Sequence, residues 1–444
     1  MQTIPAETLA GLLTDRTARG IARDTTRLIR AGTLATGTRM PPLRDLAYVM
    51  GISPGTLSGA WKELRRLNVL SGRGRNGTFI CGSSLTPRPS RYSAQGVFAE
   101  GVLDLTMASP DPALLPPVDR ALAHGARAEG LNSYHRVRIL PELERALRHT
   151  WPNKGGTMLA VNGGYNGVYL ALHALVPQGS VVAIERPAPM RLLDILDDLG
   201  AMIVEVASDR HGPDPRSLAA ALATRPTAFI FQPVLSAVTG HYCTPERMRE
   251  LGDVLAGSET LVIEDDGFGA LAIAPAQSLA DRFPDRVVHV RSFSKSLGPD
   301  LRMAVLGASE SIVEQIQSYR SFSTGWTSRI LQASVAWLLN DADTRAAVGH
   351  AGKLYAERRN ALAGELRRRG IDVGDGGGLC LFAPVQSETF ALITLAAHGI
   401  AAISSDNFAL EPSGHIRCAT SRLAGKNVVE VANAICRAAQ GTSR

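Results

Sequence analysis

One lysine in the second half of the chain lies among residue types that can hold a phosphorylated aldehyde. Lys295 follows the apolar run 287–290, with Ser292 and Ser294 before it and Arg302 after it. The run is typical of a buried strand, and a lysine at the end of a strand can reach an aldehyde bound above a parallel sheet. Hydroxyls with a guanidinium suit a phosphate. This is the chemistry of pyridoxal 5'-phosphate held as a Schiff base, although a single lysine after a strand is more often a surface residue.

A glycine-rich segment offers a second place for an anion. In Val161-Asn162-Gly163-Gly164-Tyr165, an apolar run gives way to glycines and then to a helical pattern. The first N–H groups of a helix have no partner inside the helix, so those of Gly164 and Tyr165 can bind a phosphate with the help of the helix dipole. By itself this turn is weak support, because glycine is common at strand-to-helix turns.

The elements that must position these motifs alternate between strands and helices. Short apolar runs occur between helical patterns at 157–161, 181–184, 202–204, 228–231 and 261–263. Continuous apolar runs between helices predict an α/β fold with a mostly parallel sheet covered on both faces. Beyond about residue 340, an Arg-rich helix, short strands and a last helix over 428–439 predict a smaller α+β subdomain.

The distribution of charge predicts a separate basic domain at the N-terminus. The chain of 444 residues is too long for a single core, and its net charge is +6. Residues 1–90 contain thirteen Arg or Lys and five Asp or Glu, a net charge of +8, which leaves −2 for the remaining 354 residues. This contrast favours a polyanionic partner, although basic surfaces are often only solvated. The Ser-, Pro- and Gly-rich residues 83–102 predict a linker between a domain over 1–82 and a body over 103–444.

The N-terminal pattern predicts a helix-turn-helix. Apolar residues at helical spacing fill 6–32, and a short helix over 43–50 ends at Gly51 as its C-cap. The next helix begins after Ser53, a good N-cap, with Pro54 at its first position. Two helices joined by a Gly-Ile-Ser turn fit a helix-turn-helix. The alternative is a small helical domain that does not bind DNA.

A hairpin follows these helices. Asn76-Gly77 is a strong turn signal between the short apolar runs 69–70 and 78–80. Arg73 and Arg75 beside the turn predict a wing that grips phosphates or a minor groove.

Residues 37–80 resemble the DNA-binding domain of GntR-type regulators, a winged helix-turn-helix, and the resemblance extends over nearly all of 6–82. It implies phosphate contacts near the first short helix, a recognition helix that opens after Gly51, and a wing. The DNA-binding residues so implied are Arg39, Arg44, Ser53, Gly55, Thr56, Arg73, Arg75 and Gly77. The family often has an arginine where Pro54 stands, so that base contact is either absent here or supplied by the wing arginines.

The motifs of residues 103–440 resemble, in their order, those of class I aminotransferases of fold type I. The resemblance makes Lys295 the Schiff-base lysine, Asp265 the partner of the pyridine nitrogen, and Arg417 the ligand of a substrate carboxylate. Without the resemblance, Asp265 reads as a helix cap or part of a solvated turn. The cofactor-binding residues so implied are Gly164, Tyr165, Asp265, Ser292, Ser294, Lys295 and Arg302, with Tyr134 contributed by the partner subunit of a homodimer.

The departures from the aminotransferase pattern concern contacts to the cofactor ring. Ala237 replaces the asparagine that bonds the ring hydroxyl, and Phe268 stands in the stretch that usually supplies a tyrosine. Pro189 aligns with the aromatic residue that stacks on the ring. The expected anchor, phosphate contacts and nitrogen partner remain, which suggests that binding has outlasted efficient transamination.

The combination of the two domains resembles the MocR family of bacterial transcription regulators. It implies a protein that binds promoter DNA and senses pyridoxal phosphate or its adduct with an amine or amino acid. One alternative is a working aminotransferase with an appended DNA-binding domain. Another is a regulator whose body has lost the cofactor and binds a different small molecule or only dimerises.

The remaining composition favours a cytoplasmic protein. No apolar run approaches the ~18 residues of a membrane span, and residues 1–10 show no signal-peptide pattern. The five cysteines are scattered and do not pair at metal-ligand spacing, which predicts free thiols and no metal site.

Overall fold

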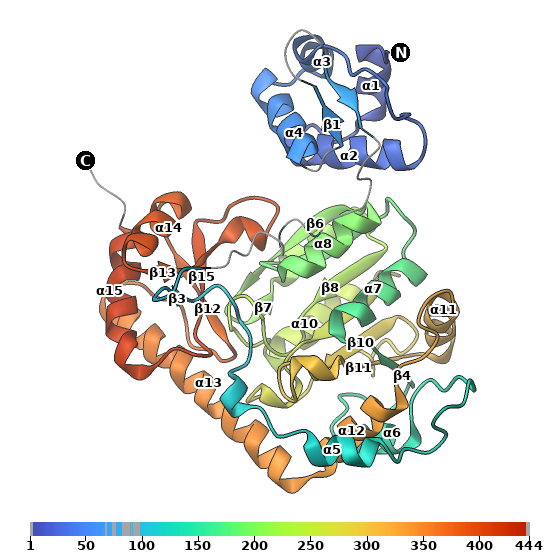
Figure 1. Cartoon of the computed structure of the whole chain (residues 1–444), viewed down its shortest axis with the longest axis vertical. Coiled ribbons are helices and arrows are strands. Elements are labelled where there is room, and N and C mark those ends of the chain that lie inside the picture. Colours follow the sequence, from blue (N-terminus) through green and yellow to red (C-terminus); the bar gives the residue numbers. More distant parts are fainter. Residues whose placement is uncertain are drawn as a thin grey trace. The chain divides into compact units, whose positions relative to one another are not determined.

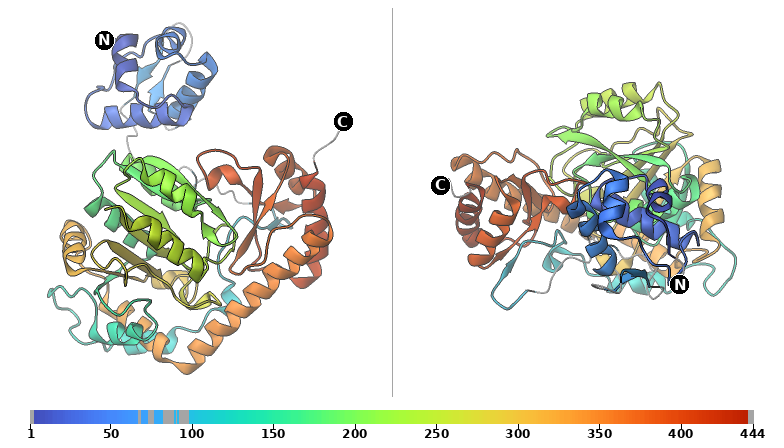
Figure 2. Two further views of the ribbon diagram at one scale, coloured as in Figure 1. Left: turned by 180° about the vertical axis from the view of Figure 1, so that it is seen from behind. Right: turned by 90° about the horizontal axis from the view of Figure 1, so that it is seen from above.

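The computed structural model describes residues 3–66, 69–72, 77–81, 89, 91 and 98–440 (Figures 1 and 2). Its internal contacts divide the chain into two compact units, residues 1–89 and 90–444. No helix in these ranges is long and apolar enough to cross a membrane.

The N-terminal unit is a winged helix built on one small core. Leu9, Leu46 and Trp61 are fully or almost fully buried and come from three different helices. The two short strands pair in antiparallel fashion, Leu70 with Ile80, to form the base of the wing. The elements are α1 (Ala6–Leu12), α2 (Ala18–Arg30), α3 (Leu43–Met50), α4 (Pro54–Arg66), β1 (Leu70–Ser71) and β2 (Phe79–Ile80).

Polar caps decide where these helices begin and end. The apolar pattern of residues 6–32 forms two helices, because Asp24 accepts hydrogen bonds from the backbone N–H of Thr14 at 2.9 Å and so holds the turn between them. Thr17 caps the start of α2 by accepting from the N–H of Gly20 at 3.0 Å. The Gly51 C-cap is confirmed by its left-handed φ of 65°.

The larger unit contains an eight-stranded sheet in the order β4-β11-β10-β9-β8-β5-β6-β7. The pairs from β10 through β9, β8 and β5 to β6 are parallel, whereas β11 runs antiparallel to both of its neighbours. The mostly parallel sheet expected from the sequence is therefore confirmed. The strands are β4 (Thr157–Val161), β5 (Val181–Arg186), β6 (Met202–Asp209), β7 (Gly212–Pro213), β8 (Ala228–Phe231), β9 (Leu261–Asp266), β10 (Val287–Ser292) and β11 (Ala304–Ala308).

Helices cover both faces of this sheet (Figures 1 and 2). Apolar residues of α7, α8 and α11 pack with the sheet in one core, and those of α9 and α10 pack in another. Helices α5, α6 and α12 share a third core with parts of β4 and β11. The bounds are α5 (Asp119–Gly125), α6 (Pro141–Arg148), α7 (Gly164–Leu175), α8 (Met190–Leu199), α9 (Pro215–Leu222), α10 (Pro245–Leu255), α11 (Glu310–Arg320) and α12 (Arg329–Asn340).

The C-terminal subdomain has its own sheet, in the order β12-β15-β14, and its own core. The body's first strand also joins it: Leu103 pairs with Ile400, and Leu105 is buried in the core. The elements are β3 (Leu103–Asp104), α13 (Ala342–Arg368), β12 (Cys380–Pro384), α14 (Glu388–Ala397), β13 (Ile400–Ala401), β14 (Ile403–Ser404), β15 (His415–Ala419) and α15 (Val428–Ala439). Short 3-10 helices lie at η3 (Pro112–Leu114), η4 (Gly269–Leu271), η5 (Pro299–Leu301), η6 (Ser405–Asn407) and η7 (Gly425–Asn427).

Most of the residues expected to form a linker, 83–102, lie outside the described ranges. Arg91 is an exception. Its side chain is 2% exposed and contacts Asp194 and Asp197 of α8, so Arg91 is fixed to the body.

Candidate functional site

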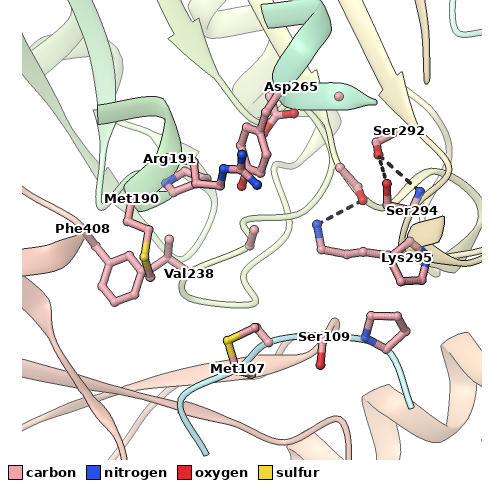
Figure 3. Close-up of a pocket in the computed structure, with 18 of the residues that line it drawn as sticks. Met107, Ser109, Met190, Arg191, Val238, Asp265, Ser292, Ser294, Lys295 and Phe408 are labelled. Atoms are coloured by element: carbon pink, nitrogen blue, oxygen red, sulfur yellow. Dashed lines mark hydrogen bonds between the residues drawn. The ribbon is translucent and has the colours of Figure 1, made fainter. Parts of the chain in front are cut away.

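A cavity of about 300 Å³ lies beside the C-terminal ends of the parallel strands, where ligands bind in open α/β sheets. Its walls come from β9, the segment after β10, the start of α7, the start of α8, and the segment that follows β3. Figure 3 shows Lys295 extending into this space, with Met190, Val238 and Phe408 grouped on the opposite side. The lining residues that the sequence had singled out are Gly164, Tyr165, Pro189, Ala237, Asp265, Ser292, Ser294, Lys295, Arg302 and Arg417.

Lys295 lies three residues beyond β10 and points its amine toward β9. Its Nζ donates to the carbonyl oxygen of Gly267 at 3.3 Å and lies 4.8 Å from the ring centre of Phe268. Burial lowers the pKa of the Lys295 amine, although the nearby carboxylate of Asp265 opposes this effect. A lowered pKa increases the fraction of neutral amine, the form that attacks an aldehyde.

Asp265 is the acid of β9 that faces the cavity. It is buried, and Gln232 donates from Nε2 to its Oδ2 at 3.0 Å. Burial raises the pKa of the Asp265 carboxyl to about 6, while the positive charge of Lys295 acts in the opposite direction. The carboxyl of Asp265 can therefore change its charge near neutral pH.

The acids on either side of Asp265 belong to a different network, because side chains alternate between the faces of a strand. Glu264 lies 2.8 Å from His289, and Asp266 accepts from Arg291 at 2.9 Å. All of these groups are buried, so the reading of this stretch as a solvated turn is wrong.

The glycine turn and the serines meet at one end of the cavity. Gly163 has a φ of 104°, and a Cβ at Gly164 would lie 3.0 Å from the Cβ of Ser292. Ser292 accepts from the N–H of Ser294 at 3.3 Å. Arg302 donates to the carbonyl of Asn162 at 3.3 Å, next to this turn. N–H groups, hydroxyls and a guanidinium therefore converge where the sequence predicts a phosphate site.

Two further arginines line the cavity. Arg417, on β15, donates to the carbonyl of Thr106, and its guanidinium carbon lies 4.6 Å from the ring centre of Phe408. Its Nε is buried and has no hydrogen-bond partner among the described residues. Arg191, at the start of α8, lies over the ring of Tyr165 at 4.9 Å.

The structure places two of the three residues that depart from the aminotransferase pattern in the wall of the cavity. Ala237 and Pro189 line the cavity, and neither offers a side-chain donor or an aromatic face. Phe268 is 2% exposed and packs near Lys295.

Among the residues that sequence reasoning missed are Gln232, which contacts Asp265, and Arg191, which lines the cavity. Gln232 follows β8, next to β9 in the sheet, and its amide joins Asp265 to the N–H of Ala237 at 2.7 Å. Its position directly after a buried strand could have indicated a site residue, because ligands bind at the C-terminal ends of parallel strands. Arg191 follows Pro189 by two residues, at a turn that the sequence marked only as a missing aromatic.

Tyr134 does not belong to the cavity of its own chain. Its side chain is 86% exposed and contacts Trp326, with ring centres 6.0 Å apart. A role in the neighbouring subunit's site stays a prediction.

The predicted DNA-binding residues that the structure describes lie in the segment before α3, on α3, at the start of α4 and on the wing. Arg39 and Arg44 are exposed, and the guanidinium of Arg39 packs against Gly77, which has a φ of 80°. Ser53 caps α4 by accepting from the N–H of Thr56 at 3.0 Å, and Gly55 beside it is exposed. The wing residues Arg73 and Arg75 lie outside the described ranges.

Known proteins match both units. Residues 100–435 match the family described as aminotransferase class I and II, and residues 17–80 match the bacterial regulatory proteins of the gntR family. The vitamin B6 salvage pathway transcriptional repressor PtsJ of Salmonella typhimurium is 29% identical, over 91% of this chain and 94% of PtsJ. The HTH-type transcriptional regulator TauR of Rhodobacter capsulatus is 26% identical, over 79% of each chain.

Solved structures resemble the body. LysN, the α-aminoadipate aminotransferase of Thermus thermophilus crystallised with N-(5'-phosphopyridoxyl)-L-leucine, has a TM-score of 0.67 at 21% identity, over 77% of this chain and 93% of LysN. This likeness confirms the fold of the body. The chain belongs to the class I and II aminotransferase family. Because a gntR-family domain precedes the aminotransferase domain, it has the domain arrangement of the MocR-type transcriptional regulators.

Proposed function

We propose that this protein is a transcriptional regulator that binds promoter DNA through residues 1–82 and senses pyridoxal phosphate, or its adduct with an amine or amino acid, in the cavity of the body. One observation supports this most strongly. The cavity keeps Lys295, Asp265 and Arg302, but Ala237 and Phe268 stand where donors to the cofactor's ring hydroxyl are expected. Binding without those donors suits a sensor better than a fast enzyme.

The residues of the cavity fit the proposed cofactor. Asp265 would pair with the pyridine nitrogen, and Lys295 would hold the cofactor covalently. A Cβ at Gly164 would crowd Ser292 at the phosphate end, and Arg417 lines the same cavity with a guanidinium Nε that has no hydrogen-bond partner among the described residues. Pyridoxal phosphate supplies an electrophilic aldehyde and an electron-accepting ring when it is bound. The phosphate group of the cofactor would be bound by Gly164, Tyr165, Ser292, Ser294 and Arg302.

The charge states of Asp265, Lys295 and Arg417 determine which part of the ligand each residue can bind. With a pKa of about 6, Asp265 is mostly ionised at neutral pH, so it can stabilise a proton on the ring nitrogen. The lowered pKa of Lys295 keeps more of its amine neutral and able to form the covalent link. Arg417 would bind the carboxylate of an amino acid as a planar fork.

The DNA-binding unit would act as one of two copies in a homodimer in the cytoplasm. Arg39 and Arg44 would contact phosphates, while the start of α4 and the wing would lie in the grooves. The basic charge of residues 1–90 supports this arrangement.

The second candidate is a working aminotransferase with an appended DNA-binding domain. The observation in its favour is that Lys295, Asp265, Arg302 and Arg417 all line one cavity, which is the minimal set for the reaction.

Two measurements on the purified full-length chain separate these proposals. A visible absorbance band, lost in Lys295→Ala, is the expected sign of the bound cofactor; a colourless protein in the presence of pyridoxal phosphate would contradict the cofactor proposal. Amino acids with a keto acid should then give turnover far below the ~10 s⁻¹ that is typical of enzymes. Turnover near that value would favour the aminotransferase.

A further inference from the structure

Helix α8 contacts both the cavity and the linker. Its first residues, Met190 and Arg191, line the cavity, and Pro189 directly before them takes the place of the expected ring-stacking aromatic. Asp194 and Asp197, farther along the same helix, contact Arg91 of the linker. A single ten-residue helix of about 15 Å therefore connects the proposed cofactor site to the chain segment that leads to the DNA-binding unit.

The contact with the linker is a buried ion pair with several bonds. The Arg91 guanidinium lies 2.5 Å from Asp197 and 3.4 Å from Asp194, and the N–H of Arg91 donates to Asp194 at 3.2 Å. The side chains of Arg91 and Asp194 are 2% and 6% exposed, and that of Asp197 is 28% exposed. A buried charge that loses its partner is strongly unfavourable, so this contact tends to be either fully made or fully released.

The other end of α8 is held by the cavity wall. The N–H of Ala188 donates to the carbonyl of Phe408 at 2.8 Å, and Phe408 itself lines the cavity. Leu192, Leu193 and Leu196 pack in the core that α8 shares with α7, the helix that begins at the proposed phosphate site. A ligand that displaces the backbone at Met190 or Arg191 would therefore move the helix that carries both aspartates.

Release of Arg91 would increase the maximum distance between the DNA-binding unit and its nearest attachment to the body. Residues 82–90 separate Cys81 from Arg91, and residues 82–102 separate Cys81 from Leu103 in the first body strand. A fully extended chain would span about 35 Å in the first case and about 77 Å in the second. The Arg91 contact thus sets how many residues lie between the DNA-binding unit and its first attachment to the body, and the effective concentration of a linked binding unit depends on that number.

We propose that α8 transmits the state of the cavity to the DNA-binding unit through the contact of Arg91 with Asp194 and Asp197. A ligand shifts this contact only if it binds more tightly to one position of α8 than to the other. The inference rests on the proposed function, because it requires that a ligand in the cavity alters DNA binding.

The test compares wild type, Arg91→Gln and Arg91→Lys as full-length proteins. Binding to a labelled duplex from the gene's own upstream region is measured without pyridoxal phosphate and with a saturating concentration, and the ratio of the two Kd values is the readout. The wild-type ratio should be about fivefold or more, in the range of typical allosteric coupling, and Arg91→Gln should bring it close to 1. Arg91→Lys keeps the positive charge and should retain part of the effect.

Asp198→Asn is the matched control. It removes a carboxylate from the same helix, but this carboxylate lies 3.6 Å from His173 and is distinct from the two that contact Arg91. It should keep the wild-type ratio, whereas Asp194→Asn combined with Asp197→Asn should behave like Arg91→Gln. The visible absorbance of each sample reports the cofactor, and it should be unchanged in Arg91→Gln.

The outcomes separate this inference from the proposed function. A wild-type ratio of 1, both with pyridoxal phosphate alone and with pyridoxal phosphate plus each member of a panel of amino acids, would overturn the proposed function and this inference with it. A wild-type response that Arg91→Gln retains in full would overturn this inference alone. Loss of the visible band in Arg91→Gln would also overturn it, because Arg91 would then act on the cofactor site itself.

Discussion

At the scale of single residues, Asp265 is the group whose charge the proposed cofactor site depends on. Burial raises its folded-state pKa from 3.8 to about 6, so in the unliganded protein the carboxyl becomes neutral as the pH falls through about 6. A protonated ring nitrogen needs the ionised form. We therefore expect the Kd for pyridoxal phosphate to rise about tenfold for each pH unit below about 6, as measured by absorbance titration.

The variant Asp265→Asn supplies the control for this pH dependence. It keeps the shape of the side chain and has no charge at any pH, so its affinity at pH 8 should be about 10-fold to 100-fold weaker, the value of a charged hydrogen bond. The rise in Kd below pH 6 should also disappear. If both proteins showed the same pH profile, Asp265 would not be the partner of the ring.

Gly164 shows how a single missing side chain shapes the site. A Cβ there would lie 3.0 Å from the Cβ of Ser292, at the proposed phosphate end. Gly164→Ala should weaken cofactor binding by about 1–3 kcal/mol, as overpacking does elsewhere, with little change in the far-UV circular dichroism. Gly155→Ala is the control, because a Cβ at Gly155 meets no heavy atom of the described residues within 4 Å. Equal cofactor affinities in the two variants would refute the assignment.

At the scale of elements, α3 and α4 carry the proposed DNA contacts. Arg44 is exposed in the first turn of α3, and a phosphate contact there does not depend on base sequence. Arg44→Ala should weaken binding equally on all duplexes and reduce the slope of log K against log salt by about 1. Arg120→Ala, an exposed arginine of α5 in the body, should leave the slope unchanged. A sequence-dependent loss would mean that Arg44 reads bases instead.

Much of this arrangement was predictable because the decisive signals are local in the sequence. The cap at Ser53, the C-cap at Gly51 and the last helix over 428–439 follow from residues within a few positions of one another. The cavity also gathers the ends of parallel strands and the starts of the helices that follow, as the general rule for α/β sheets predicts. Lys295 and Asp265, which the resemblance to class I aminotransferases had assigned to one site, both line this cavity.

The features that sequence reasoning missed join residues that are far apart in the chain. The bond from Gln232 to Asp265 depends on the order of the strands in the sheet, which periodicity does not give. The contact of Arg91 with Asp194 spans 103 residues, and the composition around Arg91 indicates only a linker. The pairing of β3 with β13 likewise brings Leu103 to a subdomain that the sequence pattern placed beyond residue 340.

At the scale of the whole molecule, we expect a homodimer in which each subunit contributes Tyr134 to the cofactor site of the other. If Tyr134 serves the neighbouring subunit, Tyr134→Phe should retain pyridoxal phosphate more weakly without losing thermal stability. A mixture of Tyr134→Phe and Lys295→Ala chains should recover tight binding in a fraction of sites, because a mixed dimer contains one site with both native residues. Absorbance after gel filtration measures the recovery. No gain on mixing, or a monomer that keeps the cofactor, would contradict the shared site.

The central claim is that a ligand in the cavity of the body alters binding of DNA by the N-terminal unit. Its most direct test is a footprinting titration of the upstream region with pyridoxal phosphate and a panel of amino acids, using wild type and Lys295→Ala. Lys295→Ala removes the covalent link but leaves the DNA-binding unit intact, so it should bind DNA with its response to these ligands lost. The wild-type footprint should change as the ligand is added. Identical responses of the two proteins, or no response in either, would contradict the account.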